Sequence, residues 1–245
     1  MKLGKYGTIV RGVLDLDATK SFYEDLGYVK LDGSNTSFKW LLFTDGRVDL
    51  LIEEGDIAYT GLVYQNPKFD ETLSYLKNNG VEIIERKPRT EEIPASASFL
   101  GPEGMKCYIL KETHNPETKP DLSAKSKVRF GKFGELAITV NDIEPVIEFW
   151  NKLGFKTELK ELEPQPWAIL QDGNIVLGFH EEDWGDYNGK PAITYFDPNM
   201  EDILQELKKE GISISPVEDY TVESGYGVAT APDGLRILLF KGEIP

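Results

Sequence analysis

An internal repeat with an offset of 127 residues limits the folds that this chain can adopt. Residues 5–28 read KYGTIVRGVLDLDATKSFYEDLGY, and residues 132–155 read KFGELAITVNDIEPVIEFWNKLGF. Asp15 recurs as Asp142 and Gly27 as Gly154 (142 − 15 = 127 and 154 − 27 = 127). A strand-like run, a capping Asp, a short helix and a Leu-Gly end therefore occur twice, which indicates a duplicated domain.

The same offset relates two predicted hairpins. Asp45-Gly46 and Asp172-Gly173 each lie between apolar runs (172 − 45 = 127), and Asp-Gly in this setting favours a tight turn between antiparallel strands. Each half continues with a strand, a helix and further strands around a closing turn at 101–104 or 231–234. Each half therefore reads as two strand–helix–three-strand units, and the predicted fold class is α+β.

Single residues give local predictions. Asp15 has the chemistry of an N-cap, because its carboxylate can accept hydrogen bonds from free backbone N–H groups. Pro67 suits the first position of the next helix, where its missing N–H costs nothing. Residues 81–84 are expected to form a strand. The first two helices are expected to bury one stripe each: Ala18, Phe22 and Leu26, then Phe69, Leu73 and Leu76.

Composition limits the partners and the compartment. The 27 Lys and Arg residues against 42 Asp and Glu residues give a net charge of −15, which disfavours binding to nucleic acid and to anionic membranes. No signal peptide or membrane span is visible. The single cysteine, Cys107, cannot form an internal disulfide and lies in an apolar run, so we expect a buried thiol in a reducing, cytoplasmic setting.

The repeat also predicts the domain boundaries. The stretch from Glu112 to Lys127 contains Pro116 and Pro120, many charges and almost no apolar residues, which is typical of a linker. We therefore predict an N-terminal domain at 1–111, a linker at 112–130 and a C-terminal domain at 131–245.

The residues of the repeat resemble a known superfamily. The run from Gly134 to Asp142, followed by Phe149-Trp150 and Leu153-Gly154, is similar to the opening of a vicinal oxygen chelate domain. The ending from Ala231 to Leu239 is similar to the closing hairpin of such domains. The superfamily includes glyoxalase I, extradiol dioxygenases and bleomycin-resistance proteins. The resemblance implies tandem glyoxalase-like domains, each of two βαβββ units that form a curved mixed sheet around a cup.

Members of this superfamily commonly hold a divalent metal with one side chain from each of four strands. The resemblance places these positions at Thr8 and Glu135 on the first strands, near Asp49 or Leu51 and Val176 or Gly178 on the fourth, near Gly61 and Ala192 on the fifth, and at Tyr108 and Leu238 on the last. A metal needs three or four converging donors, and these positions supply too few in either half. The chain has only two histidines, His114 and His180. We therefore predict no metal and no cofactor.

Glu135 is the leading candidate for function. Strand alternation points it into the cup together with Thr139, where it is a candidate general base or a partner for a cationic ligand. The alternative is an internal ion pair with Arg236. Trp40 and Trp167 either stack on a flat ligand or fill the cup. Arg236, Thr8 and Tyr108 complete the predicted ligand-binding set.

Three functions follow from this sequence. The preferred one is a metal-free protein of the bleomycin-resistance type that binds a small organic molecule, with a cationic guest favoured by the negative charge. The second is a metal-dependent isomerase, lyase or dioxygenase with a non-standard site. The third is a module whose cups serve as a surface for a protein partner. The chain is expected to be a monomer of two pseudo-equivalent domains or a homodimer.

Overall fold

The computed structural model describes residues 2–36, 38–90, 94–111, 120–217 and 222–244. The N-terminal half contains β1 (Tyr6–Val13), α1 (Leu16–Asp25), β2 (Val29–Asn35), β3 (Lys39–Thr44), β4 (Asp49–Glu54), β5 (Tyr59–Gln65), α2 (Phe69–Asn78), β6 (Glu85–Lys87), β7 (Ser96–Leu100) and β8 (Lys106–Leu110). The C-terminal half contains β9 (Lys132–Thr139), α3 (Ile143–Lys152), β10 (Lys156–Glu161), β11 (Trp167–Gln171), β12 (Val176–His180), β13 (Ala192–Asp197), α4 (Met200–Lys209), β14 (Ile214–Ser215), β15 (Tyr226–Thr230) and β16 (Arg236–Lys241). Short 3-10 turns lie at Gly185–Tyr187 and Val222–Ser224.

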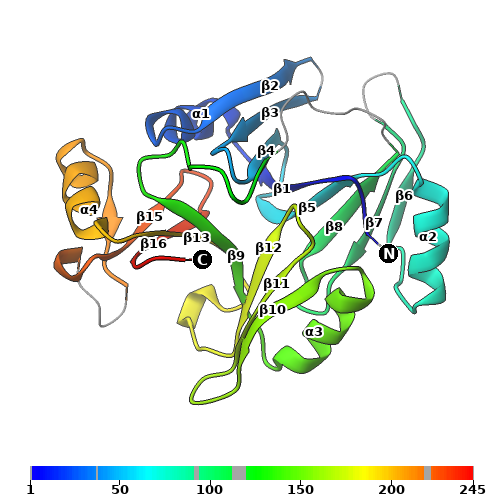
Figure 1. Cartoon of the computed structure of the whole chain (residues 1–245). Helices are drawn as coiled ribbons and strands as arrows, with labels where there is room; N and C mark the ends of the chain where they lie inside the picture. Colours follow the sequence, from blue (N-terminus) through cyan, green and yellow to red (C-terminus); the bar gives the residue numbers. More distant parts are fainter. Residues whose placement is uncertain (1, 37, 91–93, 112–119, 218–221, 245) are drawn as a thin grey trace. The chain divides into compact units, whose positions relative to one another are not determined.

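Each half of the chain forms one eight-stranded mixed sheet. The strand orders are β2-β3-β4-β1-β5-β8-β7-β6 and β10-β11-β12-β9-β13-β16-β15-β14, which are the same order with eight added to each number (Figure 1). The last strand of each half runs parallel to the strand before its helix, β8 beside β5 and β16 beside β13. The predicted α+β class and the tandem duplication are confirmed.

The chain divides into two compact units that do not coincide with the two halves. One unit contains residues 1–11, 60–119 and 138–190, and the other contains residues 12–59, 120–137 and 191–245. Each unit therefore combines one helix-bearing segment from each half: α2 with α3 in the first unit, and α1 with α4 in the second. The predicted domain boundaries follow the sheets rather than these units, and they stay a prediction.

The helix ends agree closely with the repeat. Asp15 and Asp142 are the N-caps of α1 and α3, and their carboxylates accept from Ala18 N and Glu144 N, each at 3.0 Å. Gly27 and Gly154, just past the two helices, have φ of 94° and 99°, a backbone region that suits glycine. Local chemistry is enough to fix these boundaries.

Three local predictions are wrong. Pro67 is not the first helical residue, because α2 begins at Phe69 with Lys68 as its N-cap. No strand covers residues 81–84, and the strand forms at Glu85–Lys87 instead. The third, the stripe of α1, is wrong in part: Leu26 is buried as predicted, but Ala18 is exposed and Phe22 is half-buried. The helix itself buries Leu16, Thr19 and Tyr23. Tyr23 is buried because its ring packs edge-on against Tyr28, a contact that helical spacing alone does not reveal.

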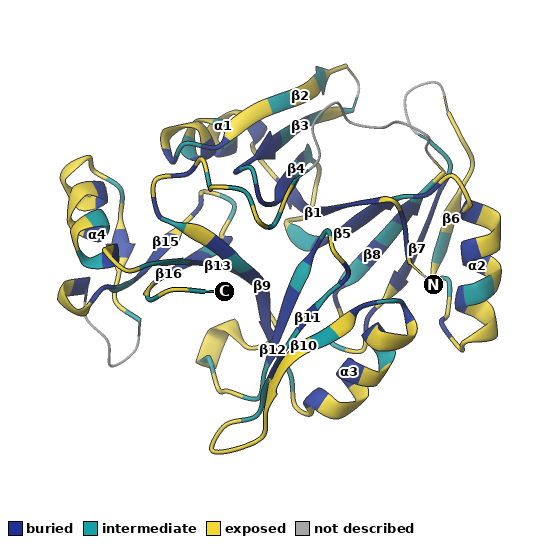
Figure 2. Ribbon diagram, viewed as in Figure 1, coloured by how far each residue is buried: buried dark blue, intermediate teal, exposed yellow. Residues whose placement is uncertain are grey.

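The edge strands β2 and β10 have no clear sequence signal. The side chains of β2 are mostly exposed, as Figure 2 shows in yellow and teal, so this strand lacks the apolar alternation that marks a half-buried strand. In contrast, the predicted stripe of α2 is correct, with Phe69, Leu73 and Leu76 between 0% and 4% exposed. Cys107 is buried and free, as predicted.

Part of the predicted linker is described. Residues 112–119, including His114, lie outside the described residues. In the remainder, Asp121 N donates to Gly46 O, Lys127 N donates to Asp45 O, and Arg47 Nη1 donates to Ala124 O at 3.0 Å. Phe130 is 1% exposed. Residues 120–130 therefore pack against the β3–β4 turn, within their own unit.

Candidate functional site

The face of the second sheet that turns away from α4 carries the main candidate residues. A Cβ built on Gly227 of β15 would meet the Leu204 side chain of α4 at 3.0 Å, so α4 covers the face of Gly227 and of Leu239, its partner on β16. Side chains alternate along a strand, and Leu238 and Arg236 therefore lie on the opposite, helix-free face.

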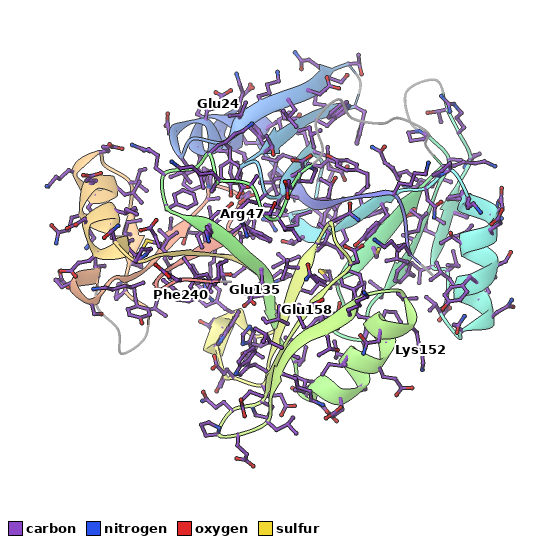
Figure 3. The ribbon with its side chains drawn as sticks, viewed as in Figure 1. Glu24, Arg47, Glu135, Lys152, Glu158 and Phe240 are labelled. Carbon is purple, nitrogen blue, oxygen red and sulfur yellow. The ribbon has the colours of Figure 1, made fainter. Side chains whose placement is uncertain are left out.

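Two small residues stand between two charged ones on this face. Ala192 of β13 lies directly opposite both Ala137 of β9 and Arg236 of β16. Alternation along β9 puts Glu135 on the same face as Ala137. Neighbouring strands are about 4.8 Å apart, so β9 and β16 are separated by roughly 10 Å. Figure 3 labels Glu135 on β9 and Phe240 on β16, which belong to this sheet. Both alanines are buried, at 0% and 1% exposed, and they share this face with a carboxylate and a guanidinium.

The side chain of Thr194 holds the backbone of Glu135 in place. Its Oγ1 accepts a hydrogen bond from Glu135 N at 3.0 Å and donates one to Glu135 O at 3.4 Å. The register of β9 against β13 shifts at this point, and the threonine hydroxyl satisfies the peptide groups that the irregular step exposes. Glu135 is 9% exposed and Thr194 is 1% exposed. Sequence reasoning missed Thr194, because the matching residue of the first half is Val63.

The residues do not fit the superfamily's usual metal centre. On the helix-free face of the second sheet, the usual ligand positions hold Glu135, Ala192 and Leu238, of which only Glu135 has a donor side chain. Across the described ranges, no three His, Cys, Asp or Glu side chains come together as metal ligands would. A two-histidine, one-carboxylate site therefore cannot be assembled from the described side chains.

The acidic run after β12 supplies hydrogen-bond acceptors to its own loop and to the start of α3. Glu181 Oε1 accepts from Ile143 N at 2.8 Å at the start of α3. Asp183 Oδ1 accepts from Gly185 N and from Asn188 Nδ2 at 2.9 and 2.7 Å, which lowers the pKa of this carboxyl, the Asn188 bond being the larger cause. These carboxylates are used as hydrogen-bond acceptors by the backbone and by one amide.

Thr139 and Trp167 belong to the other compact unit from Glu135 and Arg236. Thr139 Oγ1 accepts from Gly189 N at 2.7 Å and lies 3.5 Å from Asn188 Oδ1, so its hydroxyl holds the loop before β13. Trp167 is half-buried and lies opposite His180 on β12. Their role in ligand binding stays a prediction.

The first sheet presents a different set of side chains on its helix-free face. Arg86, which lies opposite Ala97, has its guanidinium 5.8 Å from the ring of Phe69 on α2, so α2 covers that face. Tyr108 and Ser98 lie opposite each other on β8 and β7. Ser98 is next to Ala97 along β7, and side chains alternate along a strand, so this pair faces away from α2. Lys106 Nζ lies 4.8 Å from the centre of the Tyr108 ring.

An ammonium and a carboxylate also meet there. Lys106 Nζ is 3.5 Å from Glu85 Oε2. The repeat maps Lys106 onto Arg236 and Tyr108 onto Leu238 (236 − 106 = 130 and 238 − 108 = 130). The two cations are therefore equivalent positions of the repeat.

Thr8 and Trp40 are the remaining predicted residues. Thr8, on β1, is 2% exposed. Trp40, on β3, is half-buried between Ser34 of β2 and Glu53 of β4 in the register of the hairpin. Thr8 and Trp40 belong to different compact units, so each stays a separate candidate.

Two surface cavities are defined by described residues, and neither is lined by a predicted site residue. One of about 180 Å³ lies between the end of α2 and α3, with Val81, Pro102 and Phe149 among its walls. The other, of about 370 Å³, lies beside the start of α2, with Phe69, Arg86 and Lys111 among its walls.

Cys107 is not placed for nucleophilic chemistry. The thiol is fully buried, and burial raises its pKa well above the usual value, with smaller contributions from Glu103 and Asp172. A thiol that stays protonated is a weak nucleophile. The residue acts as a small apolar part of the core.

Comparison with known proteins shows which proteins share this architecture. Residues 132–239 match the model of the Glyoxalase/Bleomycin resistance protein/Dioxygenase superfamily. No curated protein matches the sequence.

Solved structures match nearly the whole chain. Catechol 2,3-dioxygenase matches with a TM-score of 0.61 at 18% identity, covering 97% of this chain and 87% of that one. The 2,3-dioxygenase LapB from Pseudomonas sp. KL28 matches with a TM-score of 0.63 at 16% identity, covering 98% and 92%.

A mutant of homoprotocatechuate 2,3-dioxygenase from Brevibacterium fuscum gives a TM-score of 0.62 at 15% identity, covering 99% of this chain and 72% of that one. At these identities the likeness concerns the fold. Residues 132–239 match the superfamily model, and the first half repeats the strand order of the second, so both halves have the fold of the vicinal oxygen chelate superfamily, which contains the glyoxalases and the extradiol dioxygenases.

Proposed function

We propose that this protein binds a small polar organic molecule on the helix-free face of its second sheet, between Glu135 and Arg236. The observation that carries the proposal is the register of Ala192 with Ala137 and Arg236, which sets two small side chains between the carboxylate and the guanidinium. The carboxylate and the guanidinium on this face are the groups that would orient a polar guest.

The chemistry of the two charged groups defines the guest. Glu135 offers a carboxylate that accepts hydrogen bonds from an ammonium or hydroxyl group, and Arg236 offers donors that suit a carboxylate or carbonyl oxygen. A dipolar molecule satisfies both, and a purely cationic one uses Glu135 alone. Glu135 is also the candidate general base if the bound molecule is converted rather than stored.

Ligand binding is tested by thermal shift with cationic, zwitterionic and neutral amines on the full chain. A true ligand raises the melting temperature in a concentration-dependent way. Glu135→Gln keeps the size of the side chain and Arg236→Gln replaces the charge with a shorter neutral amide; each is expected to abolish the shift. Lys106→Gln, at the matching position of the first sheet, is the control and keeps it. If the shift survives in both test variants, the site is elsewhere.

The second candidate is a metal-dependent enzyme of the dioxygenase type. The solved structures that match are extradiol dioxygenases, and this supports the enzyme, whereas the side chains at the usual ligand positions support a metal-free binder. Elemental analysis of protein purified without chelators separates the two. A stoichiometric transition metal that is lost in Glu135→Ala, together with oxygen uptake in the presence of a catechol, would favour the enzyme.

The proposal also covers the oligomeric state of the protein and its cellular compartment. None of the described helices, which are ten residues long or shorter, could cross a membrane. We propose a cytoplasmic protein that works as a monomer of two pseudo-equivalent halves or as a homodimer, and light scattering of the purified chain decides between these states. A stable complex with another protein that blocks the ligand-induced shift would favour the interaction-module hypothesis.

A further inference from the structure

The cavity beside the start of α2 lies outside every predicted site. Its walls are Phe69, Arg86, Lys87, Pro88, Ala95 and Lys111, and its volume is about 370 Å³. Cavities that hold small ligands begin at about 300 Å³. The apolar part of the wall comes from Phe69, Pro88 and Ala95. The cavity is therefore large enough for a small organic molecule and has an apolar surface to receive its body.

Two cations at this cavity are held in place by one carboxylate. Asp70 Oδ1 is 2.9 Å from Arg86 Nη2, and Asp70 Oδ2 is 2.8 Å from Lys111 Nζ. Both cations also lie near the ring of Phe69, at 5.8 and 6.0 Å from its centre. The pKa of Asp70 is lowered, mainly by the hydrogen bond from Lys111. One aspartate and one ring thus set the positions of a guanidinium and an ammonium.

Most of the donors of these cations are not used within the described part of the chain. A guanidinium has five N–H donors and an ammonium has three. Asp70 accepts one bond from each of them. Lys87, the third cation of the wall, is 3.1 Å from Glu85 Oε1, so its charge is largely compensated. The donors that remain on Arg86 and Lys111 can bind an anion, and Arg86 can do so in a bidentate manner.

Comparison with the second half of the chain shows which residues of this cavity occur in the first half alone. The repeat maps Asp70 onto Glu201 and Lys111 onto Lys241, and this pair is also present, at 3.5 Å. Phe69 maps onto Met200 and Arg86 onto Pro216 (200 − 69 = 131 and 216 − 86 = 130). The acid–lysine pair is therefore common to both halves, whereas the guanidinium and the aromatic ring occur in the first half alone.

We propose that this cavity is a second ligand site, separate from the Glu135–Arg236 face, for a small organic anion. A carboxylate or phosphate head binds Arg86 and Lys111, and the apolar body lies against Pro88, Ala95 and the ring of Phe69. Asp70 acts as a positioning residue for the two cations. The proposal does not depend on what binds between Glu135 and Arg236.

The test is isothermal titration of the full chain with phenyl phosphate, benzoate, inorganic phosphate and benzamide. Phenyl phosphate or benzoate is expected to bind saturably, and neutral benzamide is not. The stronger of the two acids identifies the head group. Phe69→Leu is expected to weaken the aromatic acid more than inorganic phosphate, because the ring lies beside both cations and also forms part of the apolar wall.

Three further variants locate the site. Arg86→Gln and Lys111→Met each remove a charge-assisted hydrogen bond and are expected to weaken binding about tenfold or more. Their side chains are more than half exposed, so the fold is not at risk. Lys241→Met, at the matching position of the second half, is the control and is expected to bind as the wild type does.

Two results would overturn the inference. One is the failure of every acid to saturate the protein at millimolar concentration. The other is binding that is lost in Arg236→Gln but kept in Arg86→Gln, which would assign the anion to the helix-free face of the second sheet. Loss in Arg86→Gln with normal binding in Arg236→Gln supports the second site, whatever the outcome for the proposed function.

Discussion

The two compact units contain matching Tyr–Asp pairs, but only one of the pairs is complete. In the unit that holds α1 and α4, Tyr195 donates to Asp45 Oδ2 at 2.8 Å, and its oxygen is 2.7 Å from the hydroxyl of Tyr28. In the other unit, Tyr64 and Asp172 occupy the matching positions (195 − 64 = 131 and 172 − 45 = 127). Among the described residues, Tyr64 Oη and Asp172 Oδ2 are enclosed without a hydrogen bond of normal geometry.

One side chain explains part of the difference. The residue that matches Tyr28 is Phe155, so the second pair lacks the third hydroxyl. Burial, followed by the charge of Asp172, raises the pKa of Tyr64 well above its usual value, which indicates that the two groups are close. Duplication therefore kept the apolar frame in both units, but it kept a satisfied polar network in one only.

The turns that close each half differ in the same way. Asp233 Oδ1 accepts from Leu235 N at 2.9 Å and stabilises its own turn. The matching residue of the first half is Glu103, which is one methylene longer and turns inward to accept from Trp150 Nε1 at 3.3 Å. Its Oε1 is enclosed without a partner among the described residues, and burial raises the pKa of Glu103 to about 7.

Removing the complete pair should have the largest effect. Tyr195→Phe leaves the buried Asp45 carboxyl without its tyrosine donor and removes the partner of Tyr28, so we expect a loss of about 3 kcal/mol in the free energy of unfolding. Tyr64→Phe is the matched variant and should cost little, because no good hydrogen bond is lost. Urea unfolding measures both. Equal losses would show that the two pairs do not differ in energy.

The pH dependence of stability should trace to Glu103. Its pKa in the folded state, about 7, exceeds the ordinary value of 4.5, so the folded state holds the proton more tightly. The contribution is fully present below about pH 4.5 and is lost as the pH rises through 7. We expect a loss of about 2 kcal/mol, allowing for partial exposure.

Glu103→Gln tests this origin. The variant stays neutral at every pH, so it should remove that part of the pH dependence and unfold at higher urea than the wild type at pH 8. Asp233→Asn is the matched control and should leave the slope between pH 5 and 8 unchanged. An unaltered slope in Glu103→Gln would mean that another buried acid, such as Asp45, carries the effect.

Supplying the missing hydroxyl should make the units more alike. Phe155→Tyr places a phenol where Tyr28 stands in the other unit, and Phe155 contacts Trp150 at 5.1 Å much as Tyr28 contacts Tyr23 at 5.2 Å. One new buried hydrogen bond is expected to add about 1 kcal/mol to the free energy of unfolding. The same measurement in the Tyr64→Phe background should show no gain. Destabilisation by Phe155→Tyr would mean that the space differs.

The helix caps should show the smallest difference between the halves. Asp15→Ala and Asp142→Ala each remove one capping bond of 3.0 Å, and each is expected to cost about 1 kcal/mol. The two losses should agree to within about 0.5 kcal/mol, because local backbone chemistry is the same at both places. A large disagreement, measured by urea unfolding, would show that tertiary contacts at the two helix starts are unequal.

Local chemistry let the sequence predict much of the fold. The capping residues Asp15 and Asp142, the glycines after the helices and the Asp-Gly turns act over a few residues, and they were placed correctly. The repeat then showed that these pieces occur twice in the same order. The shared face of Glu135 and Arg236 also follows from strand alternation, although what binds there stays a prediction.

Tertiary structure alone decided the rest. Which face of α1 is buried depends on Tyr23 meeting Tyr28, and the inward turn of Glu103 depends on a tryptophan 47 residues away. The division into units that mix both halves, the Tyr195–Asp45 bond between residues 150 apart, and the clamp of Arg86 and Lys111 on Asp70 are all long-range arrangements. Packing and burial select such contacts among many that the sequence permits, so local sequence patterns do not predict them.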